Sequence, residues 1–187
     1  MPSDAVAIAP ISIARAWNVQ GRPGAAMHAV VQRILQVNLP LAANTFTRAP
    51  AGCALWLGPT SWLVVSGAPA RGPDLADARR DIDGAGGALF DLSAARVGWR
   101  LSGPGARTVL AHGCPLDLHP RAFAAGACAQ SVYGHVNAMI VRDDDGADDP
   151  AAFVLMTARS YARDVLHLLR EAAAPLKGEM LPAVAWP

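Results

Sequence analysis

The stretch LSGPGARTVLAHGCPLDLHPRAFAAGACAQ, residues 101–130, does most to define the fold of this chain. Gly103-Pro104-Gly105 forms a turn that leads into a short helix, and Gly113 ends that helix. A long irregular connection follows, residues 113–130, which we call the signature loop. Loops of this length are uncommon in compact domains unless they have a function. We therefore expect the signature loop to have a role of its own.

Short apolar and alternating runs surround this stretch and predict strands. The second half of the chain contains predicted strands 97–101, 129–133, 136–141 and 153–157, with helices at 106–112 and from residue 160 onward. The first half repeats this order, with predicted strands at 8–17, 44–48, 54–57, 62–65 and 88–92 and helices at 27–35 and 73–84. The helix at 27–35 has one apolar stripe, made of Met27, Val30, Val31, Ile34 and Leu35.

Each half therefore reads as a βαββαβ unit. The sequence predicts an α+β fold of two split βαβ, ferredoxin-like units packed together. The hairpin at 54–65 resembles the pair of runs at 138–141 and 153–156, which indicates a duplication. We expect an N-terminal lobe at residues 1–94 and a C-terminal lobe at residues 95–187, which contains the signature loop.

Composition excludes several classes of protein. Of the 187 residues, 52% are apolar, which is enough for a core, and the net charge of +1 favours neither nucleic acid nor an anionic membrane as a partner. No apolar run reaches the roughly 18 residues of a membrane span, and the N-terminus does not resemble a signal peptide. Three cysteines do not make a full disulfide framework, so we expect reduced thiols and a cytoplasmic location.

The signature loop contains metal-ligand residue types without metal-site spacing. Cys114, Cys128, His112 and His119 are chemically sufficient for zinc, but they form no Cys-x-x-Cys or His-x-x-x-His pair, so we expect no metal. The loop length allows a Cys114–Cys128 disulfide, but reduced, buried thiols are the favoured interpretation.

A nucleophilic site is also not favoured. Cys114, Asp117 and His119 all lie in one short loop, whereas catalytic sets are usually assembled from separate elements. We expect His119 to bond a backbone carbonyl and to shape the loop. No dinucleotide fingerprint or phosphate-binding loop is present, so the sequence predicts no catalytic and no cofactor-binding residue in this chain.

The signature loop carries a resemblance to a known family. The run Gly113 to Arg121, then Phe123, then Gly126-Ala127-Cys128-Ala129-Gln130, resembles the gamma subunit of heterotetrameric sarcosine oxidase. Leu39-Pro40-Leu41, Asn44-Thr45, the run at 55–59, Asp91-Leu92-Ser93 and Arg159-Ser160-Tyr161 extend this resemblance over most of the chain. The second half is more distantly similar to the folate-binding aminomethyltransferases, typified by the glycine-cleavage T-protein, although Ala94 stands where that family often has histidine.

This resemblance implies an accessory or assembly chain. In that family, alpha, beta and delta chains are the partners, and FAD, FMN, NAD and tetrahydrofolate are expected in those chains. In that family the complex oxidises sarcosine with oxygen to give glycine and hydrogen peroxide and, with tetrahydrofolate, forms 5,10-methylenetetrahydrofolate. The alternative is a stand-alone tetrahydrofolate-binding, aminomethyltransferase-like module.

Two further expectations concern residue roles. We interpret Asp91 as a turn former rather than a pterin ligand, because an acid at a strand end followed by Ser93 usually caps a turn. The signature loop is expected to be a structural and docking element whose candidate residues are Cys114, Pro115, Asp117, His119, Arg121, Phe123 and Cys128.

Overall fold

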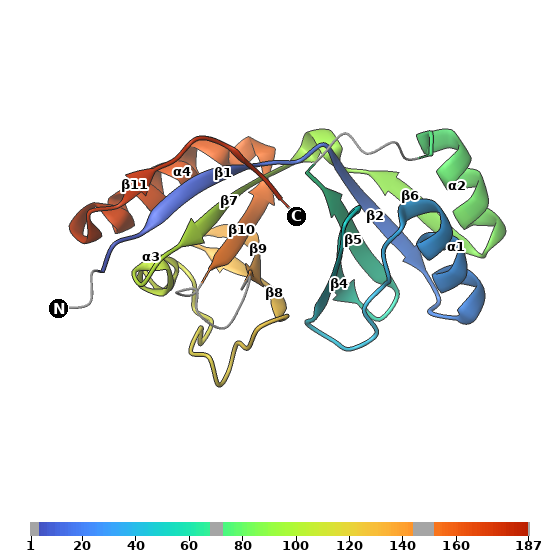
Figure 1. Ribbon diagram of the computed structural model, residues 1–187, viewed down its shortest axis with the longest axis horizontal. Helices are drawn as coiled ribbons and strands as arrows, with labels where there is room; N and C mark the ends of the chain where they lie inside the picture. Colours follow the sequence, from blue (N-terminus) through green and yellow to red (C-terminus); the bar gives the residue numbers. More distant parts are fainter. Residues whose placement is uncertain (1–3, 68–72, 144–151, 187) are drawn as a thin grey trace. The chain divides into compact units, whose positions relative to one another are not determined.

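The computed structural model describes residues 4–67, 73–143 and 152–186, and the chain divides into two compact units. Unit 1 comprises Met1–Ile11 and Ala95–Val184, and unit 2 comprises Ser12–Ala94 and Ala185–Pro187. Each unit has its own mixed sheet-and-helix architecture (Figure 1). The α+β class predicted from the sequence is confirmed.

Unit 2 is built on an antiparallel sheet in the order β3-β4-β5-β2-β6. The strands are β2 (Arg15–Gly21), β3 (Phe46–Ala49), β4 (Gly52–Gly58), β5 (Ser61–Ser66) and β6 (Gly87–Asp91). Helices α1 (Ala25–Leu35) and α2 (Leu75–Gly84) pack against this sheet (Figure 1). Because strand side chains alternate in direction, Trp17, Val19 and Val64 lie in one core with Met27 and Ile82 of the helices.

Unit 1 is built on a sheet in the order β11-β1-β7-β10-β9-β8, and β12 also pairs with β1. The strands are β1 (Ala7–Ser12), β7 (Arg96–Ser102), β8 (Cys128–Tyr133), β9 (Val136–Arg142), β10 (Phe153–Ala158), β11 (Glu179–Met180) and β12 (Val184–Ala185). Its helices are α3 (Ala106–Ala111) and α4 (Ala162–Ala173), and short 3-10 turns occur at Ser93–Ala95, Arg159–Tyr161 and Ala174–Leu176.

The two units share one strand arrangement. In unit 2, β5 lies between β4 and β2, and β6 lies on the other side of β2. In unit 1, β10 likewise lies between β9 and β7, with β1 on the other side of β7. The strands β3 and β8 extend the two sheets at equivalent edges. The βαββαβ order expected from the sequence is therefore present in unit 2 with β3 added.

Unit 1 differs from this order because one of its strands, β1, comes from the other end of the sequence. The position that β6 fills in unit 2 is filled in unit 1 by β1, which comes from the start of the chain. Ile8 of β1 pairs with Leu101 of β7 and is fully buried in the unit 1 core. Residues 1–11 thus group with 95–184, not with the lobe at 1–94 to which sequence analysis assigned them.

The predicted single strand at 8–17 is also corrected. It is two strands, β1 and β2, which belong to different sheets. Alternating apolar residues predict a strand on either side of this point, but the alternation does not reveal where the pairing partner changes. Among the described residues, no helix has both the length and the hydropathy needed to cross a bilayer.

Candidate functional site

The signature loop begins at a close backbone contact in unit 1. The Cys114 N–H donates to the Leu110 carbonyl at 2.9 Å, and the Gly134 N–H donates to the Gly113 carbonyl at 2.8 Å. A Cβ at Gly113 would lie 3.0 Å from the Gly134 nitrogen and 3.0 Å from the Tyr133 ring. A side chain larger than that of glycine would therefore push β8 away from the end of α3.

Tyr133 supports this junction through a buried hydrogen bond to α3. Its side chain is 1% exposed, and its hydroxyl donates to the Val109 carbonyl at 3.1 Å. Burial, with a smaller contribution from Cys114, raises the pKa of Tyr133 to about 12. The phenol is therefore held as a neutral hydrogen-bond donor to the last turn of α3.

Asp117 and His119 fold the middle of the loop. Asp117 Oδ1 accepts a hydrogen bond from the His119 N–H at 2.9 Å, and His119 Nδ1 accepts one from the Arg121 N–H at 3.3 Å. The His119 carbonyl accepts from the N–H groups of Ala122 and Phe123 at 2.9 and 2.8 Å. His119 does shape the loop, but its ring nitrogen contacts a backbone N–H instead of the carbonyl expected from the sequence.

Two apolar side chains attach the loop to the unit 1 core. Leu118 and Phe123 are 3% and 6% exposed. The Phe123 ring stacks on Phe153 of β10, with centroids 6.4 Å apart and an angle of 18° between the planes. The loop is thus seated on the core of unit 1 by Leu118 and Phe123.

Two arginines outside the loop hold its backbone, and sequence reasoning missed both. Arg107 Nε of α3 donates to the Leu118 carbonyl at 2.7 Å, and Arg142 Nη1 of β9 donates to the Phe123 carbonyl at 3.4 Å. Both guanidinium groups also lie over the Phe153 ring, at 5.8 and 5.2 Å from its centroid. Such contacts to backbone carbonyls have no sequence motif. The available signal was only that two arginines occur in otherwise apolar elements.

The cysteines of the loop are buried and are not disulfide-bonded. Cys114 is 5% exposed and Cys128 is fully buried, as the sequence predicted. Cys114 Sγ lies 3.7 Å from Ser131 Oγ. Within residues 4–67, 73–143 and 152–186, no group of three or more His, Cys, Asp or Glu side chains is placed to hold a metal ion. Asp117 contacts the backbone of His119 and not its imidazole, so these contacts do not form a Cys-His-Asp relay.

The outer side of the loop is left to solvent. Pro115, Asp117, His119 and Arg121 are exposed. In the part of the chain that the structure describes, the Arg121 guanidinium forms no ion pair or hydrogen bond. The seven candidate residues therefore fall into two groups. Cys114, Phe123 and Cys128 form the buried side of the loop, and the other four form its exposed side.

Asp91, the other candidate carboxylate, lies at the end of β6 in unit 2. Its Oδ1 accepts hydrogen bonds from the Ser93 N–H at 2.9 Å and the Ser93 hydroxyl at 2.6 Å. Ser93 Oγ in turn accepts from the Ala16 N–H at 3.0 Å. The hydrogen bonds from Ser93, with a smaller attraction from Arg79, lower the pKa of Asp91. The turn-forming role inferred from the sequence is confirmed.

Comparisons with known proteins agree with the resemblance carried by the loop. The sarcosine oxidase, gamma subunit family matches residues 21–175. The sarcosine oxidase subunit gamma of Arthrobacter sp. is 34% identical over 139 residues, which cover 74% of this chain and 68% of that protein. The subunit gamma of Corynebacterium sp. strain U-96 is 28% identical over 170 residues, covering 90% and 79%.

Solved structures show the same fold. A chain of the heterotetrameric sarcosine oxidase from Corynebacterium sp. U-96, solved with pyrrole 2-carboxylate, matches with a TM-score of 0.75 and 24% identity, over 92% of this chain and 85% of that one. The glycine cleavage system aminomethyltransferase T from Bartonella henselae matches with a TM-score of 0.65 and 19% identity, over 94% of this chain and 47% of that one. The chain thus spans about half of an aminomethyltransferase and has a T-protein-like fold. From the family match and the identity to the Arthrobacter protein, the chain belongs to the sarcosine oxidase gamma subunit family.

Proposed function

We propose that this chain is an accessory subunit of a heterotetrameric sarcosine oxidase, in which the signature loop docks on a partner subunit. Family membership supports the complex, and its partners are then the alpha, beta and delta subunits. The observation that supports docking is that the signature loop has a buried side and an exposed side. Its inner side is seated on Phe153 and held by Arg107 and Arg142, and its outer side presents Arg121, whose guanidinium has no partner among the described residues.

A loop held in one shape suits docking for an energetic reason. Ordering a flexible loop at an interface costs conformational free energy, and a loop that is already ordered avoids that cost. Pro115 and Pro120 restrict the backbone, and the Asp117 and His119 hydrogen bonds fix the turn between them. Arg121 can then offer a bidentate contact to a carboxylate of the partner.

The catalytic cofactors belong to the partner subunits in this proposal. FAD, FMN, NAD and tetrahydrofolate are held by those subunits, and this chain supplies no catalytic residue. Asp91 and Tyr133, described titratable groups with a clearly shifted pKa, both have structural hydrogen-bond partners. A cytoplasmic location agrees with three cysteines that are buried and not disulfide-bonded.

Co-purification tests this proposal. The chain is co-expressed with the alpha, beta and delta subunits, and recovery of the alpha subunit on the tagged gamma chain is measured. Arg121→Glu is expected to reduce recovery at least fivefold with an unchanged circular dichroism spectrum. Arg163→Glu makes the same charge change on an exposed position of α4 and serves as the control. Equal recovery for the two variants would argue against docking through the loop.

The chain alone provides the second arm of the test. It is expected to show no flavin absorbance after gel filtration and to produce no hydrogen peroxide from sarcosine. Calorimetry with tetrahydrofolate distinguishes the proposed accessory role from the alternative, a stand-alone folate-binding module. Stoichiometric tetrahydrofolate binding by a chain that does not co-purify with the other subunits would favour a stand-alone folate-binding module.

A further inference from the structure

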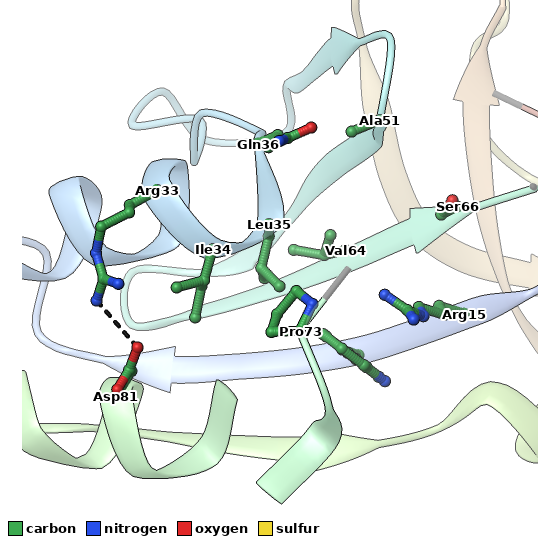
Figure 2. A pocket seen from close by; sticks show the side chains of 11 residues that line it. Arg15, Arg33, Ile34, Leu35, Gln36, Ala51, Val64, Ser66, Pro73 and Asp81 are labelled. Atoms are coloured by element: carbon green, nitrogen blue, oxygen red, sulfur yellow. Dashed lines mark hydrogen bonds and ion pairs between the residues drawn. The ribbon is translucent and has the colours of Figure 1, made fainter. Parts of the chain in front are cut away.

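Unit 2 contains a cavity that none of the roles above uses. It has a volume of about 340 Å³ and lies between α1, the β2 and β5 strands and Pro73 (Figure 2). Most of its lining is apolar, and its lining residues include Trp17, Ile34, Leu35, Val64, Ala51 and Pro73. Small-molecule sites have volumes of about 300–1,000 Å³ and are mostly apolar with a few polar groups. In volume the cavity resembles a binding site.

Arg15 is the charged group that distinguishes this cavity. It is half-buried on β2, and its guanidinium lies over the Trp17 ring at 5.1 Å from the centroid. This cation–π contact fixes the guanidinium beside Trp17. Figure 2 shows the Arg15 side chain among the lining residues. Arg15 forms no ion pair with any acidic residue that the structure describes.

The other charges in the lining cancel each other. At the far end of the cavity, Arg33 Nη2 lies 3.0 Å from Asp81 Oδ2, drawn as a dashed line in Figure 2. The remaining polar lining residues, Gln36 and Ser66, are neutral. The described lining therefore carries one net positive charge, located at Arg15. A ligand with one negative charge matches that balance better than a dianion such as a phosphate monoester.

Guanidinium geometry and cavity size define the ligand further. A carboxylate can accept two parallel N–H bonds from one guanidinium, which suits a single arginine better than other monoanions do. A cavity of about 150 Å³ accommodates benzene, so 340 Å³ corresponds to a ligand of about fourteen non-hydrogen atoms. Ile34, Leu35 and Val64 offer an apolar surface to such a ligand.

We propose that this cavity binds a small monocarboxylate with an apolar body, with the carboxylate on Arg15 and the body between α1 and β5. The site is separate from the signature loop, which lies in unit 1. It is also independent of the docking proposal, because neither Arg15 nor any other lining residue takes part in that surface.

The test uses 2-naphthoate as the probe and 2-naphthamide as a neutral control of the same shape. Calorimetry on the full chain measures both affinities. Loss of a charge-assisted contact worth about 1.4 kcal/mol or more raises the dissociation constant at least tenfold. We therefore expect naphthoate to bind at least tenfold more tightly than naphthamide. Arg15→Gln should remove that difference, and Arg22→Gln, at an exposed position of unit 2 outside the lining, should leave it within threefold.

Methyl NMR locates the bound probe. In a chain labelled at isoleucine δ-methyl groups, naphthoate should shift the Ile34 signal, and Ile140 in the unit 1 core should not move. Unchanged Ile82 and Ile140 signals in Arg15→Gln establish that this variant is folded. A second variant, Leu35→Trp, fills the cavity, retains Arg15 and should abolish naphthoate binding.

Three outcomes would overturn the proposal. The first is the absence of naphthoate binding at 1 mM by the folded wild-type chain. The second is equal affinity for the acid and the amide, and the third is binding that leaves the Ile34 methyl signal unchanged. If Arg15→Gln instead abolishes assembly with the alpha subunit while naphthoate does not bind, the cavity receives a partner's acidic segment and the small-molecule proposal fails.

Discussion

Replacing Phe123 by alanine tests how firmly the signature loop is seated. The ring is 6% exposed and stacks on Phe153 at 6.4 Å, within the core of unit 1. Burying an aromatic side chain contributes about 1.5–3 kcal/mol, and an aromatic pair adds about 0.5–1.5 kcal/mol. The cavity left by truncation brings the expected loss of unfolding free energy to about 3–5 kcal/mol, the range measured for buried aromatic-to-alanine changes.

Urea unfolding with hydrogen-exchange mass spectrometry measures this loss. Because the chain has two units, exchange resolves which unit is destabilised. Peptides from β10 and α4 should exchange faster in Phe123→Ala, and peptides from α1 and β2 should not. Phe123→Leu retains most of the apolar volume and should cost only about 1–1.5 kcal/mol.

Phe90→Ala is the matched control, since Phe90 is 46% exposed and should change stability by at most about 0.5 kcal/mol. A loss below about 1 kcal/mol for Phe123→Ala, or equal losses for Phe123→Ala and Phe90→Ala, would refute the interpretation of Phe123 as the anchor of the loop.

His119→Ala removes the acceptor for the Arg121 N–H, and we expect turnover of the assembled complex to fall by less than about tenfold; a thousandfold loss with assembly intact would place chemistry in the loop. Tyr133→Phe leaves the Val109 carbonyl without its side-chain donor and should cost about 1–2 kcal/mol by urea unfolding. Because the folded-state pKa of Tyr133 is raised to about 12 from 10.0, its contribution is present below pH 10 and is lost as the pH rises toward 12. Wild type should therefore lose more stability than Tyr133→Phe over that interval, and parallel curves would contradict this. The pKa of Asp91 is lowered by Ser93, so its contribution is present above the unfolded-state pKa and is lost as the pH falls through the folded-state value. The stability difference between wild type and Asp91→Asn should accordingly narrow between pH 6 and pH 2, and a constant difference would show that the carboxylate charge has no part in the turn.

Local patterns were sufficient to predict most helices and strands. The apolar stripe of α1 is confirmed, with Met27 and Val31 buried and Ile34 and Leu35 packed against the same core. The hairpin of β4 and β5 is where the alternation placed it. These elements depend on neighbours within a few residues, so their periodicity is visible in the sequence.

Long-range contacts were not predictable in the same way. The pairing of Ile8 with Leu101 depends on a partner strand far along the chain, and alternation around Ile8 is compatible with either sheet. The same limit applies to the candidate site, because Arg107 and Arg142 donate to backbone carbonyls. Every residue has such a carbonyl, so no residue type in the sequence marks the acceptor. The cavity beside Arg15 also depends on the spacing between α1 and β5, which no local pattern encodes.

The origin of β1 has a consequence for the order of folding during synthesis. The main part of unit 2, Ser12–Ala94, is inserted between β1 and β7, so the ribosome completes this part before β7 is available. When unit 2 folds, its ends are brought together, since the Leu92 N–H donates to the Ala16 carbonyl at 2.7 Å and the Ala16 N–H donates to Ser93 at 3.0 Å. An open loop of about ninety residues is thereby reduced to one of about ten, which lowers the entropic cost of pairing β1 with β7 by about 2 kcal/mol. We therefore expect unit 2 to fold first. Its folding shortens the chain between β1 and β7, so that β1 can pair with β7 as soon as β7 has been synthesised.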